Sequence, residues 1–336
     1  MPRRFIALIS ILFVIAAACG GTDDAGDSGS ITVYSGRSEE LVAPLIEQFE
    51  EETGIAVEVR YAESAELAAT ILEEGANSPA DVFFAQDPAS LGAVALGGYF
   101  RSLDDALLDK VDAGFSDVEG RWVGISGRAR VVVYDSEKID PATLPTTEDD
   151  FTDPAWAGRL AVAPTNGSFL AFVAAKILID GEEATLDWLE GIRGNNAPTY
   201  PSNSVIVAAV DAGEVDAGLA NHYYLFRRRD EVGDTIAANH FMTGGGAGSL
   251  VMPAGAGILA SSENATAAAV FIEYLLGEEA QTFFADETFE YPLASEVTAN
   301  DELPPLADLN PPQLLLSDLA GALDQATDLV AAAGLL

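Results

Sequence analysis

Two tyrosines stand side by side in the stretch "NHYYLF", Asn221–Phe226, directly after an asparagine and a histidine. A phenol that loses its proton becomes an anionic oxygen donor, so such a pair can bind a cation. In an ordinary β-strand, however, neighbouring side chains point to opposite faces of the sheet. Tyr223 and Tyr224 are therefore either packing residues or two phenols that converge on one ligand.

Polar residues also stand at three predicted helix starts: Arg37-Ser38, Asn166-Gly167-Ser168 and Asn203-Ser204. The first N–H groups of a helix have no partner within the helix, and its N-terminus carries a partial positive charge. These segments therefore predict sites that bind an anion.

The elements that must position these residues alternate between strands and helices. The N-terminal part predicts strands at 31–36, 55–60 and 81–86, with helices at 38–54, 64–74 and 88–96 between and after them. Strand, helix, strand, helix, strand within seventy residues is typical of an α/β domain built from βαβ units.

The same alternation returns later in the chain. We expect strands at 128–135, at 159–163 leading into a helix to about 179, and at 215–224, where the strand ends at the tyrosines. Helices are expected at 205–212, 265–276 and 317–333, and a strand within 248–259. No internal repeat is visible.

The N-terminus has the pattern of an export signal. Arg3 and Arg4 precede an apolar run that ends in small residues before Cys19, the only cysteine. Residues 1–18 are predicted to be a signal peptide, and the cysteine after them resembles a bacterial lipobox, which implies lipid attachment at Cys19. Residues 19–30 read as an acidic linker. The alternative is an uncleaved anchor helix; both place the protein outside the cytoplasm and bound to the membrane.

The formal net charge of −38 over 336 residues excludes nucleic acid as a partner. The acidity is equally consistent with a saline habitat. Two histidines leave little for acid–base catalysis near neutral pH, and "GISGR" lacks the final glycine of a nucleophile elbow. We therefore expect a protein that is not an enzyme.

Several segments in order resemble the ferric-iron-binding periplasmic proteins, the substrate-binding components of bacterial ABC iron importers. The resemblance rests on "ITVYSGRSEELVAPLIEQFEEETGIAVEVRY", "GANSPADVFFAQD", "WVGISGRARVVVYD", "GLANHYY" and "FEYPL". It runs from about Ile31 to the C-terminus.

This resemblance implies a periplasmic-binding-protein-like α/β fold, with two lobes joined by crossover strands around a ligand cleft. One lobe would hold residues 31–128 and 253–295, and the other residues 129–252 and 296–336. The hinge would lie near 127–131 and 251–254. A monomer that binds an ABC permease is the family expectation.

The resemblance also implies the site. Tyr223 and Tyr224 would bind Fe³⁺, a hard cation that prefers anionic oxygen. The positions of Asn166, Gly167, Ser168, Asn203 and Asn221 would hold a second anion, carbonate or phosphate. Candidate cleft residues are Arg37, Ser38, Gln86 and Arg128.

This chain departs from well-known members at three positions. Ser38 and Gln86 stand where some relatives have a histidine and a glutamate, and Phe169 stands where others have a tyrosine. These departures keep open a second reading, in which the same fold binds another metal, an oxyanion or a small organic molecule. A purely structural surface lipoprotein is a further alternative. We do not expect His222 or His240 to bind metal, because imidazole is a softer donor than Fe³⁺ favours.

Overall fold

The structure is a computed structural model that describes residues 29–294 and 297–336. The predicted signal peptide, Cys19 and the linker up to residue 28 lie outside the described residues. Within those residues, no helix combines the length and the apolar composition that a membrane crossing requires.

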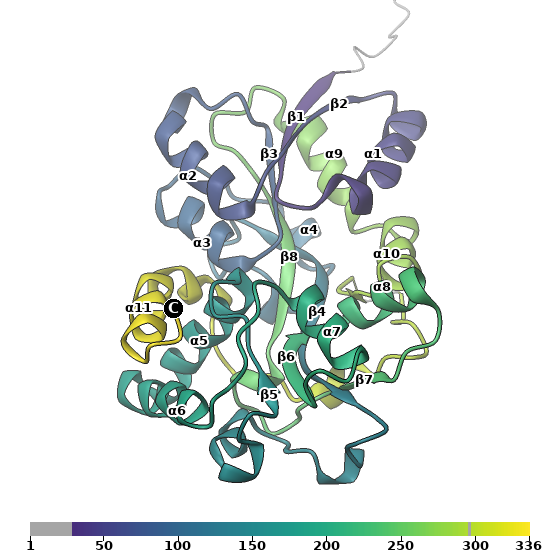
Figure 1. Cartoon of the computed structure of the whole chain (residues 1–336). Helices are drawn as coiled ribbons and strands as arrows, with labels where there is room; N and C mark the ends of the chain where they lie inside the picture. Colours follow the sequence, from purple (N-terminus) through teal and green to yellow (C-terminus); the bar gives the residue numbers. More distant parts are fainter. Residues whose placement is uncertain (1–28, 295–296) are drawn as a thin grey trace, which may run out of the picture.

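Strands and helices alternate along the chain, as Figure 1 shows. The strands are β1 (Ser30–Ser35), β2 (Ala56–Tyr61), β3 (Val82–Ala85), β4 (Val123–Asp135), β5 (Leu160–Ala161), β6 (Ala217–Asn221), β7 (Ala237–His240), β8 (Val251–Ile258) and β9 (Tyr291–Pro292). The α-helices are α1 (Glu39–Thr53), α2 (Ser64–Glu74), α3 (Pro88–Leu96), α4 (Asp105–Leu108), α5 (Gly167–Asp180), α6 (Glu182–Gly194), α7 (Asn203–Asp211), α8 (Tyr223–Val232), α9 (Ala265–Leu275), α10 (Glu278–Asp286) and α11 (Leu319–Ala332).

The strands form one continuous mixed sheet in the order β2-β1-β3-β8-β4-β6-β5, with β7 and β9 also paired to β4. β1 is parallel to β2 and β3, whereas β8 is antiparallel to both β3 and β4. This arrangement confirms the α/β class that the alternation predicted.

β4 and β8 connect the two ends of the molecule. The first half of β4, as far as Ala129, pairs with β8, and the second half, from Arg130, pairs with β6 and β7. The exchange of partners falls within the predicted hinge segment 127–131. The lobe boundaries and the hinge motion themselves stay predictions.

Most predicted elements appear with nearly the expected bounds, and α2 and α3 match to the residue. One expectation is wrong: β6 ends at Asn221, and the tyrosines begin helix α8 instead of ending a strand. His222 already has helical backbone angles, and its ring is held by the backbone of Ala129 and Phe289. Helices α4, α6 and α10 and strands β7 and β9 were not expected.

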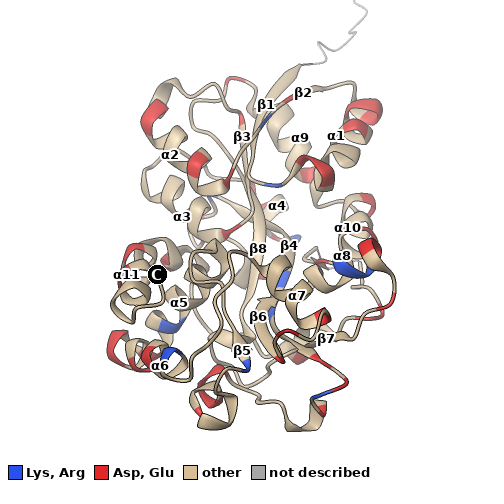
Figure 2. Ribbon diagram, in the orientation of Figure 1, with Lys and Arg blue, Asp and Glu red and all other residues tan. Residues whose placement is uncertain are grey.

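Acidic residues lie mainly on the outer helices. Figure 2 shows Asp and Glu on α1, α2, α6 and α10, away from the centre of the sheet. This distribution keeps most of the negative charge in contact with water, where it is screened.

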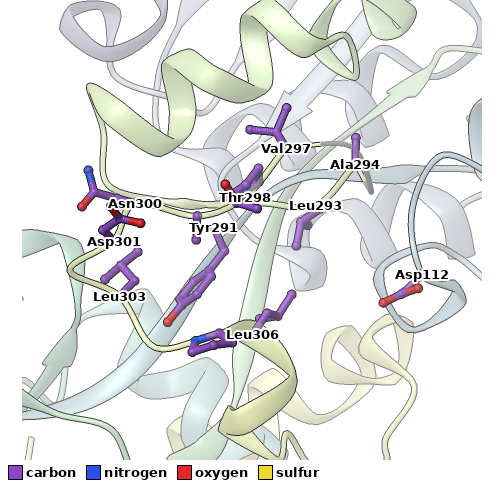
Figure 3. Close-up of a pocket in the computed structure, with 13 residues that line it drawn as sticks. Asp112, Tyr291, Leu293, Ala294, Val297, Thr298, Asn300, Asp301, Leu303 and Leu306 are labelled. Carbon is purple, nitrogen blue, oxygen red and sulfur yellow. The ribbon is translucent and has the colours of Figure 1, made fainter.

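A cavity of about 550 Å³ lies beside β9 and the segment that follows it (Figure 3). Its wall comes almost entirely from residues 291–294 and 297–306, together with Asp112. None of the predicted site residues lines it.

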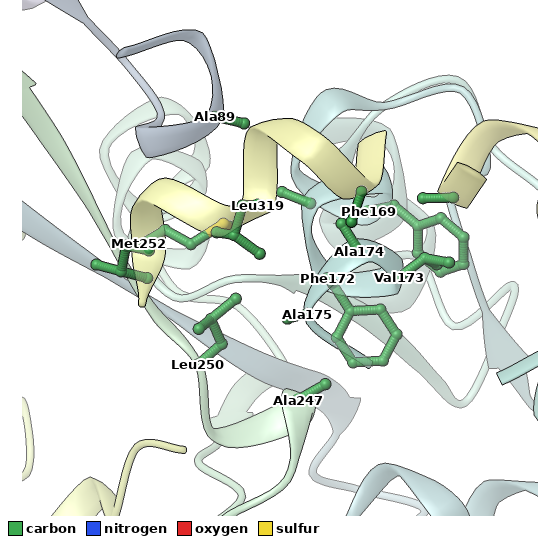
Figure 4. Packing of buried hydrophobic residues seen from close by; sticks show 14 of the residues in the cluster. Ala89, Phe169, Phe172, Val173, Ala174, Ala175, Ala247, Leu250, Met252 and Leu319 are labelled. Carbon is green, nitrogen blue, oxygen red and sulfur yellow. The ribbon is translucent and has the colours of Figure 1, made fainter. Parts of the chain in front are cut away.

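The C-terminal helix α11 packs between α3 and α5. Leu319 of α11, Ala89 of α3 and Phe169 of α5 belong to one buried cluster, which also includes Met252 of β8 (Figure 4). A side-chain carbon at Gly92 of α3 would lie 2.9 Å from the Ser317 carbonyl oxygen, so this approach requires glycine. The C-terminal segment therefore contacts elements of both predicted lobes.

Candidate metal and anion site

A cavity of about 150 Å³ collects most of the predicted site residues. It lies where β3 and β6 end, at the carboxyl ends of strands where open α/β sheets bind ligands. Its wall consists of Glu63, Ser64, Ala65, Gln86, Asp87, Arg128, Asn166, Gly167, Ser168, Asn203, Asn221, Tyr224 and Met252.

The predicted anion-binding residues at the starts of α5 and α7 form one hydrogen-bonded group. Asn166 caps α5: its Oδ1 accepts from the Ser168 backbone N–H at 3.1 Å and from Ser168 Oγ at 2.6 Å. Asn203 Nδ2, at the start of α7, donates to Asn166 Oδ1 at 3.1 Å and to Ser168 Oγ at 2.9 Å. Two helix N-termini are thereby held side by side at the cavity.

These helix starts are free of acid. The first turns of α5, α7 and α8 hold no Asp or Glu, whereas α1, α6 and α10 each begin with two glutamates. Acidic residues normally favour helix N-termini. Their absence from α5 and α7 leaves the partial positive charge of these two helix starts available for an anion, whereas Glu63 and Asp87 precede α2 and α3 at the same cavity.

Arg130 joins this group, and the sequence analysis missed it. Its Nη1 donates to Ser168 Oγ at 3.1 Å and to Asn221 Oδ1 at 3.0 Å. Asn221 is the strand partner of Arg130 across β4 and β6. The guanidinium is buried and lies 5.6 Å from the Phe172 ring centroid, and burial lowers the pKa of Arg130 to about 9. The signal was present in "RARVVV", which places two arginines on one face of a buried strand.

Arg128 also lines the cavity and is buried. Gln86 connects it to the residue after β1 when its amide is oriented so that both of its polar atoms have partners: Nε2 then donates to the Gly36 carbonyl at 3.2 Å, and Oε1 accepts from Arg128 Nη1 at 3.1 Å. The side-chain oxygen of Gln86 therefore contacts the arginine.

Arg37 lies outside the cavity wall and forms a buried ion pair. Its Nη2 is 2.7 Å from Glu290 Oε1, and Ser126 Oγ also donates to the Glu290 carboxylate. Burial opposes the charge of Glu290, but Arg37 and Arg128 outweigh it and hold its pKa below the usual range. Glu290 was not predicted, although it lies in the quoted "FEYPL" motif.

The two tyrosines occupy the first two positions of α8. Successive residues on a helix are about 100° apart, compared with about 180° on a strand, so both rings can lie on the same side. The rings stack with centroids 4.3 Å apart and an angle of 28° between their planes. Tyr224 lines the cavity, whereas Tyr223 is buried behind it. Burial raises the pKa of Tyr223 above its ordinary value of 10.0.

His222 is fully occupied by backbone groups. Its Nδ1 accepts from the Ala129 N–H at 3.1 Å, and its Nε2 lies 2.6 Å from the Phe289 carbonyl oxygen. Burial lowers the pKa of His222 to about 4, so the ring is neutral. His240 Nε2 contacts the Pro145 carbonyl at 2.8 Å, outside the cavity. Neither histidine is placed to bind a metal in this cavity.

Two positions that vary among relatives contribute no ligand in this conformation. Ser38 is exposed at the start of α1 and does not line the cavity. Phe169 is buried in the core, with its ring centroid 5.8 Å from that of Phe172. The opposite wall instead presents the carboxylates of Glu63 and Asp87, of which Asp87 accepts from Ser90 at the start of α3.

A second group of carboxylates lies outside this cavity and surrounds the ammonium group of a lysine. Glu148, Asp149 and Asp180 surround the ammonium group of Lys176, at 3.4, 2.5 and 2.7 Å. The lysine already neutralises part of their charge, so this group is an ion-pair network.

Comparison with known proteins shows a family match and relatives along most of the chain. Residues 77–314 match the family described as bacterial extracellular solute-binding protein. The chain is 33% identical over 335 residues to the Fe(3+)-binding periplasmic protein of Serratia marcescens, covering 98% of this chain and 97% of the relative. It is 35% identical to the major ferric iron-binding protein of Neisseria meningitidis serogroup B, covering 91% and 93%.

The fold is also similar to a solved structure, that of iron-bound HitA from Pseudomonas aeruginosa. The TM-score is 0.84 at 35% identity, and the match covers 91% of this chain and 99% of the other. The members of this family bind and transport solutes and are not enzymes. The chain belongs to the family of periplasmic ferric-iron-binding proteins, within the bacterial extracellular solute-binding proteins.

Proposed function

We propose that this protein binds Fe³⁺ outside the cytoplasm, together with a small anion, and delivers it to an ABC importer. The observation that carries the proposal is that two features meet at one cavity: Tyr224, which stacks on Tyr223, and the acid-free starts of α5 and α7. The relatives named for ferric iron binding support the same cargo. We further propose that Tyr223 and Tyr224 supply phenolate oxygens to the metal.

The charge of the metal explains why an anion is needed. Two phenolates leave Fe³⁺ with one positive charge that nothing balances, and an unbalanced charge is expensive in a partly desolvated cavity. Asn203 Nδ2 and Ser168 Oγ use their protons to hold the group together, so the side-chain donors for carbonate or phosphate are the Nδ2 groups of Asn166 and Asn221. Gly167 adds a backbone N–H at the start of α5.

The cavity volume bears on the alternative cargo. About 150 Å³ is the volume of roughly five water molecules, and sites for drug-sized ligands are about 300–1,000 Å³. In this conformation the space suits a metal ion with a small oxyanion, and it disfavours an organic ligand. Another metal, or an oxyanion alone, remains the second candidate, because Ser38, Gln86 and Phe169 supply no further ligand to the cavity.

Location and partners complete the proposal. Cleavage after residue 18 and lipid attachment at Cys19 would tether the protein to the outer side of the membrane. A monomer would then close its two lobes over the metal, and the closed form would bind the permease. Iron stabilises that form only to the extent that it binds it more tightly than the open form.

The test is the colour of the iron-loaded protein. Phenolate bound to Fe³⁺ gives a visible charge-transfer band, so adding chelated ferric iron and carbonate to the metal-free protein should produce it. We expect Tyr223→Phe and Tyr224→Phe to weaken the band singly and to abolish it together. Tyr99→Phe is the matched control, because this tyrosine lies outside the cavity wall.

Two outcomes would contradict the proposal in different ways. A band that survives in the double variant would remove the tyrosines from the site. A wild-type protein that stays colourless and metal-free with excess chelated iron would remove iron as the cargo. A thermal shift with phosphate but not with iron would favour the oxyanion candidate.

A further inference from the structure

His222 is a fully buried residue to which the proposed function gives no role. It stands between Asn221, the last residue of β6, and Tyr223, the first residue of α8. Its backbone N–H donates to the Ala129 carbonyl of β4 at 3.0 Å, and its own carbonyl accepts from Asn239 Nδ2 of β7 at 2.8 Å. Two strands therefore hold the main chain directly before the tyrosine pair.

The ring of His222 makes a contact that its main chain does not. Nδ1 accepts from the Ala129 N–H at 3.1 Å, so Nδ1 carries no proton and Nε2 does. The Nε2–H group then donates to the Phe289 carbonyl, 2.6 Å away. On the Ala129 side the backbone bond duplicates the ring contact. The Phe289 carbonyl accepts no other hydrogen bond from the residues that the structure describes.

Phe289 is held in an unfavourable backbone conformation. Its φ of 53° lies in the left-handed region, which bulky residues avoid, so surrounding contacts must stabilise it there. Its ring stacks on Phe226 of α8, with centroids 4.2 Å apart and an angle of 4° between the planes. Its carbonyl accepts from His222. Both contacts come from α8 or from the residue directly before it.

The next residue connects this segment to the opposite side of the site. Glu290 pairs with Arg37, which lies two residues after β1, and it also accepts from Ser126 of β4. All three side chains are buried. A continuous set of buried contacts therefore runs from the start of α8, through residues 289–290, to the chain that follows β1.

We propose that His222 is a positioning residue of the metal site. Its Nε2–H bond to Phe289 fixes the start of α8, and with it the two phenols, relative to the chain after β1. The His222 ring also packs edge-on against the Tyr223 ring, with centroids 6.1 Å apart. The inference rests on the proposed function, because it names what holds the tyrosines in place before the metal binds. Ligands that are already in position lose less conformational freedom on binding.

Two amide side chains separate the two hydrogen bonds of the ring. The amide oxygen of asparagine can take the place of Nδ1, so His222→Asn keeps an acceptor for the Ala129 N–H but is too short to reach Phe289. The longer glutamine places its amide near Nε2, so His222→Gln keeps a donor for the Phe289 carbonyl. His222→Leu removes both hydrogen bonds.

Gln281→Met is the matched control. Gln281 is also fully buried, and it lies in α10, outside the cavity wall. Its side chain hydrogen-bonds to backbone groups of Ile125, Leu275, Leu293 and Ala294. Its replacement therefore measures what the loss of a buried hydrogen-bonding side chain does by itself.

The first readout is iron binding. In competition with a chelator, His222→Leu and His222→Asn should bind Fe³⁺ about tenfold more weakly than the wild type or worse, the usual effect of losing a residue that orients a metal ligand. His222→Gln should retain most of the affinity, and Gln281→Met should retain all of it. At saturating iron, the leucine and asparagine variants should give a weaker and shifted charge-transfer band, because one phenolate no longer reaches the metal.

The second readout is amide hydrogen exchange of the metal-free protein, which does not depend on iron. Peptides from the start of α8 and from residues 287–291 should exchange faster in His222→Leu and His222→Asn than in the wild type, because these segments lose the hydrogen bond that joins them. His222→Gln and Gln281→Met should exchange as the wild type does in both segments.

The outcomes separate this inference from the iron function. Wild-type iron affinity in His222→Asn, or an equal loss in Gln281→Met, would make His222 a merely structural residue and overturn the inference. A wild type without an iron band, together with the expected exchange pattern, would refute the iron cargo and support the His222–Phe289 contact. Should His222→Leu not fold, the asparagine and glutamine variants decide, because each keeps one of the two hydrogen bonds.

Discussion

At Tyr223 two physical effects oppose each other. Burial raises the pKa of this phenol, which disfavours the phenolate that a metal requires. The start of α8 supplies a partial positive charge, and a bound trivalent cation lowers a phenol pKa much further. Metal binding at this pair should therefore release protons, and iron affinity should rise with pH.

Glu63 is the residue we expect to complete the metal site from the opposite wall. Its carboxylate is exposed, it lines the cavity with Tyr224, and it makes no capping hydrogen bond to α2. Hard cations favour carboxylate oxygen. Glu63→Gln should weaken Fe³⁺ binding by at least about tenfold. Even the loss of a residue that only hydrogen-bonds to a metal ligand lowers metal affinity by about that factor or more. Competition with a chelator of known affinity measures this.

The control for Glu63 is its neighbour Glu66, which is exposed in the first turn of the same helix but does not line the cavity. Glu66→Gln removes the same charge, so it reports the effect of net charge alone. An equal loss in both variants would show that Glu63 acts through the general field and is not a ligand.

The sequence predicted the polar side of the site better than its charged interior. Asn166, Ser168 and Asn203 could be found because helix starts have a recognisable pattern, and the structure joins them by hydrogen bonds. Arg130 and Glu290 were missed because their roles depend on pairing across the sheet. Which buried charge finds a partner is decided by strands far apart in sequence, and no local pattern reports it.

At the scale of elements, the main surprise was where β6 ends. The run "GLANHYY" has the composition of a strand, but the chain turns at His222, whose ring is held by the backbone of Ala129 and Phe289. These contacts come from β4 and from the loop before β9. The fold class followed from the alternation of strands and helices, whereas this boundary depended on tertiary contacts.

The C-terminal segment offers a prediction about pH. Asp117 accepts from Arg121 Nε at 2.8 Å and from Ser317 Oγ at 2.8 Å, which ties the segment before α11 to the β4 side of the sheet. Burial alone would raise the Asp117 pKa, but these partners outweigh it and lower the pKa below the ordinary value of 3.8. The ionised carboxylate therefore stabilises the folded state at every pH above about 4.

Asp117→Asn should lower the free energy of unfolding at pH 7 by about 1.5–3 kcal/mol, the usual contribution of hydrogen bonds to a charged group. Because the folded-state pKa is the lower one, this difference should be constant above the unfolded value and shrink as pH falls below it. Urea unfolding at a series of pH values measures it. A difference that stays constant into acid would assign the effect to packing.

At the scale of the whole molecule, the charge of −38 should make stability depend on salt. Like charges on a compact chain repel, and the Debye length falls from about 30 Å at 0.01 M salt to about 8 Å at 0.15 M. We expect the thermal midpoint to rise by at least about 2 °C over this range of sodium chloride. In a chain of this size, each kcal/mol of added free energy of unfolding raises the midpoint by about that much. Most of the rise should occur below about 0.15 M, because screening of the charges is nearly complete at that concentration. The exclusion of salt from the protein surface also stabilises the folded state, but that effect grows steadily with salt concentration. Arg130→Gln, which removes the guanidinium that donates to Ser168 and Asn221, separates this effect from occupation of the predicted anion subsite. The same rise in this variant would assign the effect to the surface charge, and its loss would assign the effect to a bound anion.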